Sequence, residues 1–294
     1  MPTTLGIDIG GTATKLALIQ DDQPPATART DTYREPSAEN LANAIQQTAA
    51  TLTDPTQIQR VGLCVPGPVN AQGVLEAAAN MPALIGRNLN DWTQTLFPEA
   101  QTIALCTDAV AAAIADHHNN PTTKRSLYLS IGTGLGGAVL DAGIPLIVTR
   151  GTPGHLGHID VSGTDPNPPQ TPGAGRGALE AYIGARGLND DGVPLETPEE
   201  LQAALTHPRV HRGLDALARG IRTFLVIYRP DEIVFMGGVA PLIEHHLDHI
   251  KTAVHNDISP AAPGQVNYRF TKVGRFAAAI GAAHHASQTS HRPA

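Results

Sequence analysis

Apolar positions along the chain fall into short runs of strand type and longer stretches with helical spacing. Runs over residues 5–9 and 15–19, separated by glycines, predict a β-hairpin over 1–19. Apolar residues spaced three or four apart after Ser37 predict a helix over 38–52. Strands over 59–65 and 102–106 follow, and a helix opens at Asp108. This alternation of strands and helices predicts a mixed α/β domain.

The second half repeats this scheme. A strand over 127–130 leads into a second glycine cluster, and a segment rich in Pro and Gly over 162–177 predicts a loop. The remaining elements that we expect are helices over 178–185, 201–205, 212–228, 241–253 and 276–287 and a strand over 233–236. We expect two domains, 1–115 and 116–275, with the last helix, 276–290, packing back on the first.

Two glycine-rich turns carry the candidate chemistry. Gly10-Gly11-Thr12 and Gly132-Thr133-Gly134 each follow an apolar strand and precede another. Glycine lets backbone N–H groups approach an anion without a Cβ in the way, so the pair predicts phosphate binding. Asp8 comes just before the first turn, where its carboxylate would repel phosphate unless Mg²⁺ with its water shell lay between them. The alternative is two ordinary glycine hairpins.

Composition excludes some functions. A net charge of −7 without a Lys/Arg cluster argues against nucleic acid as a partner. No run approaches the roughly 18 apolar residues of a membrane span, and no signal peptide precedes the first strand, so we expect a cytoplasmic protein that does not bind membranes. Cys64 and Cys106 lie in apolar runs and are predicted to be buried thiols. The histidines all follow residue 116, and we expect their pairs at 117–118, 245–246 and 284–285 to be solvated.

The order of several motifs along the chain resembles the ROK family of sugar kinases and related repressors. These motifs are Asp8-Ile9-Gly10-Gly11-Thr12, Asp108-Ala109, Gly132-Thr133-Gly134-Leu135-Gly136-Gly137, Gly157-His158, Leu179-Glu180-Ala181-Tyr182 and Gly237-Gly238. The resemblance spans nearly the whole chain. It implies an α/β fold of two RNase H-like, actin-like ATPase domains with a nucleotide and sugar cleft between them, and a homodimer.

The resemblance also implies roles for single residues. Asp108 matches the general base that takes the proton of the sugar hydroxyl, although it can also be read as a plain helix N-cap. Asn80 matches a sugar contact, or is a turn residue. The residues assigned to ATP and Mg²⁺ are Asp8, Gly10, Gly11, Thr12, Lys15, Gly132, Thr133, Gly134, Gly136, Gly237 and Gly238.

The chain departs from the family pattern in the acceptor region. Thr107 and Val110 stand where relatives have Asn, and His155 stands where they have Glu. Thr171, Gly173 and Ala178 replace the cysteines of the family's structural zinc site, so no structural zinc is expected. Glu180 and His158 remain as sugar ligands together with Thr107 and His155. His155 and His158 can also be read as ligands of a different metal.

These features predict a Mg·ATP-dependent carbohydrate kinase whose acceptor is a sugar or polyol other than standard glucose. Two alternatives are a non-catalytic sugar sensor or repressor, and an enzyme that kept the fold for another reaction. The start of the chain, Met1-Pro2-Thr3-Thr4, leaves no room for an N-terminal helix-turn-helix, which weakens the repressor alternative. Polyphosphate is a possible donor in place of ATP, but an acidic chain disfavours it.

Overall fold

A computed structural model describes residues 2–20, 23–65, 67–78, 81–148, 154–195 and 197–289. Its contacts divide the chain into two compact units. The first comprises Met1–Pro121, Pro145–Thr152 and Val273–Ala294, and the second comprises Thr122–Ile144 and Pro153–Lys272. Among the described residues, no helix is both long enough and apolar enough to cross a membrane.

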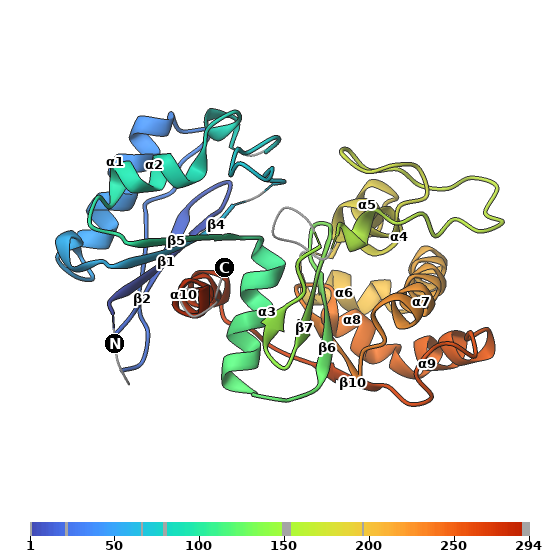
Figure 1. Ribbon diagram of the computed structural model, residues 1–294. Helices are drawn as coiled ribbons and strands as arrows, with labels where there is room; N and C mark the ends of the chain where they lie inside the picture. The colour runs from blue at the N-terminus through green and yellow to red at the C-terminus, as the bar shows by residue number, and fades with distance from the viewer. Residues whose placement is uncertain are drawn as a thin grey trace. The chain divides into compact units, whose positions relative to one another are not determined.

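The first unit is built on a five-stranded sheet in the order β3-β2-β1-β4-β5. The hairpin β1–β2 is antiparallel, and β4 and β5 extend the sheet parallel to β1. Figure 1 shows α1 and α2 over one face of this sheet, with α10 against the other. The elements are β1 (Thr4–Ile9), β2 (Thr14–Ile19), β3 (Ala26–Arg29), α1 (Ala38–Ala50), η1 (Pro55–Gln57), β4 (Arg60–Cys64), η2 (Pro82–Leu84), α2 (Leu89–Leu96), β5 (Thr102–Cys106), α3 (Asp108–Asn119) and α10 (Ala277–Thr289).

Glycines let α10 lie directly on the first sheet. A Cβ on Gly6 of β1 would sit 1.8 Å from the Ala279 carbonyl oxygen, and one on Gly62 of β4 would sit 1.8 Å from that of Ala282. No side chain fits into such contacts, because native interiors are close-packed. The C-terminal helix is therefore part of the first unit's core.

The second unit is built on a five-stranded sheet in the order β10-β9-β6-β7-β8. The pair β6–β7 is antiparallel, and β9 and β10 extend the sheet parallel to β6. The elements are β6 (Arg125–Ile131), β7 (Leu135–Asp141), β8 (Ile144–Pro145), η3 (Leu156–His158), α4 (Leu179–Ile183), α5 (Ala185–Asp190), α6 (Pro198–Ala204), α7 (Pro208–Tyr228), β9 (Glu232–Met236), α8 (Ala240–His245), α9 (Leu247–Asn256) and β10 (Asn267–Phe270).

The two sheets have the same strand order when β1 is matched to β6. In each sheet a hairpin comes first, and two parallel strands are added beside its first strand. The repetition expected from the sequence is therefore a repetition of topology. It places the two glycine turns at equivalent points, between β1 and β2 and between β6 and β7.

Several sequence expectations need correction. The helix expected over 178–185 is divided at Gly184 into α4 and α5, and the one over 241–253 is divided at His246 into α8 and α9. The strands β3, β8 and β10 and the helix α2 were missed. The pair His284-His285 was expected in solvent, but His285 is buried, and burial together with the charge of His118 lowers the pKa of His284 to about 4. These histidines pack between α10 and α3, which sequence reasoning could not foresee.

Candidate active site

The first glycine turn carries a carboxylate and an ammonium side by side. Asp8 and Lys15 are directly opposite each other in the β1–β2 ladder, and Lys15 Nζ lies 2.9 Å from Asp8 Oδ2. Asp8 is nearly buried, whereas Thr12 is exposed at the tip of the turn. Lys15 therefore offsets the negative charge that would otherwise oppose a phosphate here.

Tyr33 fixes the shape of this turn and was missed by the sequence reasoning. Its hydroxyl donates to the Gly10 carbonyl at 2.7 Å, its backbone N–H donates to the Thr12 carbonyl, and its hydroxyl also contacts Thr14 Oγ1 at 2.9 Å. Partial burial raises the pKa of Tyr33, so the hydroxyl stays protonated and can donate. No local signal identifies this residue, because it lies more than ten residues beyond the hairpin that it supports.

Asp108 is the first residue of α3, directly after β5. The alternative role as a helix cap is wrong, because the N-cap is Thr107, whose hydroxyl accepts from the Val110 N–H. The Asp108 carboxylate keeps an exposed surface and accepts from the Ala109 N–H at 2.7 Å. Crowding by surrounding protein desolvates the carboxylate and raises its pKa, and the charge of Asp8 raises it further. A raised pKa strengthens a carboxylate as a base.

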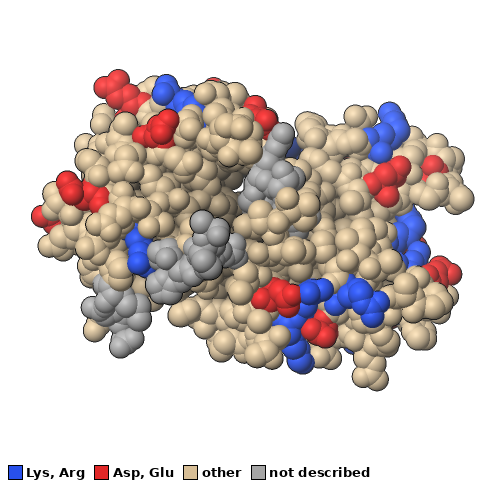
Figure 2. Space-filling model, viewed as in Figure 1, with Lys and Arg blue, Asp and Glu red and all other residues tan. Residues whose placement is uncertain are grey.

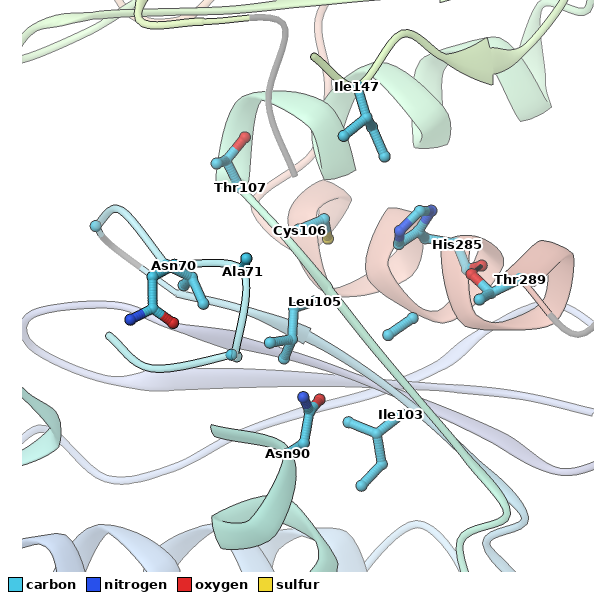
Figure 3. Close-up of a pocket in the computed structure, with 14 residues that line it drawn as sticks. Asn70, Ala71, Asn90, Ile103, Leu105, Cys106, Thr107, Ile147, His285 and Thr289 are labelled. Carbon is cyan, nitrogen blue, oxygen red and sulfur yellow. Dashed lines mark hydrogen bonds between the residues drawn. The ribbon is translucent and has the colours of Figure 1, made fainter. Parts of the chain in front are cut away.

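A cavity of about 410 Å³ runs along β5 beside Thr107. Figure 3 shows Ile103, Leu105 and Cys106 on this strand, with Asn90 pointing its amide toward them. None of the residues that line the cavity is Asp, Glu, Lys or Arg. Cys64 and Cys106 are free and buried, as expected, and the contact with Cys106 together with burial raises the pKa of the Cys64 thiol. These thiols are inert at neutral pH.

The second glycine turn is supported from the opposite side of its own unit. The Gly132 carbonyl accepts from the Ala185 N–H at 2.8 Å, and the Thr133 carbonyl accepts from the Arg186 N–H at 3.0 Å. A Cβ on Gly132 would meet no atom within 4 Å, and the Thr133 side chain is exposed. The turn thus presents free space on one side while α5 holds the other.

Glu180, on α4, links this turn to the acceptor residues predicted from the sequence. Its Oε2 accepts from the Leu135 N–H at 3.4 Å and lies 3.8 Å from His158 Nε2. Thr171 donates its hydroxyl to Glu180 Oε1 at 3.2 Å. The His158 ring in turn stacks on that of His155, with centroids 5.3 Å apart. The structure therefore brings Glu180, His158 and His155 together.

Thr171 has a role that the sequence reasoning missed. It was considered only as the replacement for a zinc ligand, but it is buried and bonded to Glu180. Both cysteines of the chain belong to the first unit, far along the chain from Thr171, Gly173 and Ala178. A hydroxyl thus contacts Glu180 at a position where the family pattern has a thiolate.

Gly237 closes the site in the second unit. Its φ of +98° lies in a region that other residues rarely adopt, and a Cβ there would sit 2.3 Å from the Ile131 carbonyl oxygen. That carbonyl accepts from the Val239 N–H, which ties the end of β9 to the strand before the second turn. Gly238 next to it faces open space. Asn80, the other predicted sugar contact, lies outside the described residues.

The first turn fits a magnesium ion held through one carboxylate. Asp8 uses only Oδ2 for Lys15, and Asp108 belongs to the same unit. Mg²⁺ commonly takes one or two carboxylates and fills its remaining positions with water and substrate phosphates. Among the residues that the structure describes, no group of three or more His, Cys, Asp or Glu side chains could hold a metal ion by itself.

The comparisons with known proteins agree with this arrangement. The ROK family model matches residues 4–289, so the chain belongs to the ROK family. It is 24% identical to the glucokinase of Thermotoga maritima, covering 95% of both chains, and 28% identical to an N-acetylmannosamine kinase of Salmonella paratyphi B, covering 88% and 90%. The structure of a ROK family glucokinase from Streptomyces griseus, in complex with glucose and AMPPNP, has the same fold, with a TM-score of 0.69, 21% identity and coverage of 97% and 99%.

Proposed function

We propose that this ROK family protein is a sugar kinase that transfers the terminal phosphoryl group of ATP to a sugar hydroxyl. The observation that carries the proposal is the pair of glycine turns at equivalent points of two sheets with the same strand order. One turn has a carboxylate, an ammonium and a candidate base in its unit. The other has the cluster of Glu180, His158 and His155.

Asp108 is the group that takes the proton. Its raised pKa and exposed surface suit a base that accepts a proton from an attacking sugar hydroxyl while the phosphoryl group transfers in line. Lys15 neutralises charge near the phosphates, and the free N–H groups of both turns bind phosphate oxygens. Magnesium, bound through Asp8, would neutralise charge on the phosphates.

Glu180 and His158 bind the acceptor in this proposal. An ionised carboxylate accepts from two hydroxyls at once, and Thr171 and the Leu135 N–H fix the direction of its oxygens. His155 stands where the family pattern has a second carboxylate, so one acceptor of hydroxyl protons is replaced by an imidazole. We therefore propose an acceptor other than standard glucose. Val110 does not contribute to this argument, because its side chain is buried in the first unit's core.

ATP is the proposed donor in preference to polyphosphate. A long polyanion is bound by a continuous positive surface. On the face shown in Figure 2, Lys and Arg are interspersed with Asp and Glu and form no continuous track. The relative that was crystallised with AMPPNP supports the same donor.

The test is ADP release measured over a panel of hexoses, N-acylated amino sugars, anhydro sugars and polyols, with ATP and with polyphosphate. We expect ATP-dependent turnover of one acceptor class. We expect kcat/KM for glucose to be lower than for the best acceptor by a factor on the order of 10²–10⁴, because two lost hydroxyl contacts cost about 1–3 kcal/mol each. Sugar binding by calorimetry without turnover of any sugar would instead support the sensor.

A further inference from the structure

The corner between α4 and α5 contacts both parts of the candidate site in the second unit. Glu180 lies in α4, and the first two N–H groups of α5 donate to the Gly132 and Thr133 carbonyls. Gly184 joins the two helices, and a Cβ on it would lie 3.0 Å from the Thr133 carbonyl oxygen and 3.1 Å from Gly134 Cα. The corner therefore touches the turn so closely that the two cannot move independently.

One buried guanidinium holds this corner. Arg209 extends from the first turn of α7, and its side chain is 7% exposed. It donates to the Ala181 carbonyl at 2.8 Å and to the Tyr182 carbonyl at 2.7 Å, both in α4. It also donates to the Gly187 carbonyl at 3.5 Å in α5 and pairs with Asp191 just beyond that helix.

A planar fork is needed to satisfy this set of acceptors. Arg presents five N–H donors in fixed directions, whereas Lys presents three on one atom. The carbonyls of α4 that Arg209 binds lie in the last turn of the helix, where no N–H of the same helix is available. Glycine at 187 permits the close approach of α5, because a Cβ there would lie 2.3 Å from the Ala181 carbonyl oxygen.

We infer that Arg209 is a positioning residue that sets Glu180 and the second glycine turn together. The inference rests on the proposed function for the roles of these two groups, acceptor binding and phosphate binding. Arg209 contacts neither substrate in this view. Its loss affects both substrates at once because the corner that it holds is one rigid piece.

The experiment compares Arg209→Lys with Arg222→Lys. Arg222 lies on the same helix and likewise donates to a backbone carbonyl, that of Ala253, and pairs with a carboxylate, Asp257. We expect Arg209→Lys to raise KM for ATP and for the acceptor together and to lower kcat/KM by a factor on the order of 10–10², while Arg222→Lys leaves them near wild type. Glu180→Gln should raise KM for the acceptor only.

Hydrogen exchange followed by mass spectrometry separates this inference from the proposed function. In Arg209→Lys, exchange should rise in residues 132–137 and in 179–190 together, whether or not any sugar is turned over. Gly184→Ala leaves Arg209 in place but pushes the corner from the turn, and should raise exchange in 132–137; it serves if Arg209→Lys does not fold. A rise in 179–190 alone, or a change in the KM of one substrate alone, would overturn the inference.

Discussion

The two glycine turns occupy equivalent points in two sheets of the same topology, yet different chemistry supports them. The first turn has charged side chains in its own hairpin, Asp8 and Lys15, and a tyrosine that holds its backbone. The second turn has no charged residue in its hairpin between Gly132 and Gly137 and relies on α4, α5 and the guanidinium behind them.

The difference indicates a division of roles. A turn with a carboxylate, an ammonium and a neighbouring base is suited to metal binding and proton transfer. A turn with free space on one side and a carboxylate braced against the other is suited to binding and orientation. The same local motif thus acquires its role from what packs behind it.

The largest expected effect separates chemistry from binding. Asp108→Asn should lower kcat by about 10²–10⁴-fold, because a positioned base is lost, with acceptor affinity nearly unchanged. Glu180→Gln should mainly raise the acceptor KM. The kcat/KM of the wild type should fall as pH drops through the raised pKa of Asp108, since the base must be ionised. Steady-state kinetics over pH with the best acceptor measure both effects.

The control for Asp108→Asn is Asp91→Asn, which changes an acidic residue in the first turn of α2. It should leave kcat unchanged. Near-normal turnover in a folded Asp108→Asn variant would show that another group takes the proton.

A second, smaller effect tests the open side of the second turn. A Cβ added at Gly132 meets no protein atom, so Gly132→Ala should keep the melting temperature of the wild type. If phosphate occupies that space, the variant should raise KM for ATP by roughly 10–100-fold through loss of a charge-assisted hydrogen bond. Gly264→Ala is the matched control, because a Cβ there also meets open space. Equal ATP kinetics for the two variants would rule out phosphate at Gly132.

A third effect compares the stability of the two units in acid. His284 has a pKa of about 4 in the folded chain against 6.5 in the unfolded one, so its stabilising contribution is complete above 6.5 and is lost between pH 6.5 and 4. In the second unit, burial alone would raise the pKa of Asp165, but hydrogen bonds from Tyr182 and Arg212 lower it to about 2. Its contribution is complete above 3.8 and is lost only as pH falls toward 2.

The first unit should therefore open first in acid. From pH 7 to 5 we expect the melting temperature to fall by about 2–4 °C, which corresponds to about 1 kcal/mol after allowance for the solvent-exposed part of His284. His284→Phe should flatten this slope, because the stacked ring remains and the proton site is gone. An unchanged slope in that variant would assign the effect to another group.

The smallest expected effect is none at all. Chelator treatment should leave the melting temperature unchanged, because Thr171, Gly173 and Ala178 cannot supply thiolates. Elemental analysis of the purified protein provides the second measurement. One tightly held zinc per chain would contradict the expectation and would direct attention to His155 and His158.

Periodicity and glycine placement determined much of the fold from the sequence alone. The hairpin ahead of Thr14, the helix after Ser37, the strand over 102–106 and the helix opening at Asp108 are all local features, because spacing and capping act between near neighbours. The breaks at Gly184 and His246 were not foreseen, since only packing ends a helix whose local signals permit it to continue.

The sequence also identified the candidate residues one by one, through motifs that each occupy a few positions. What only the tertiary structure decided is which distant groups support them: Tyr33 on the Gly10 carbonyl, Thr171 on Glu180 and Arg209 behind α4. These contacts join residues that are nine or more positions apart, and no short-range spacing records them. The physical reason is that backbone carbonyls and buried carboxylates need partners wherever the folded chain happens to supply one.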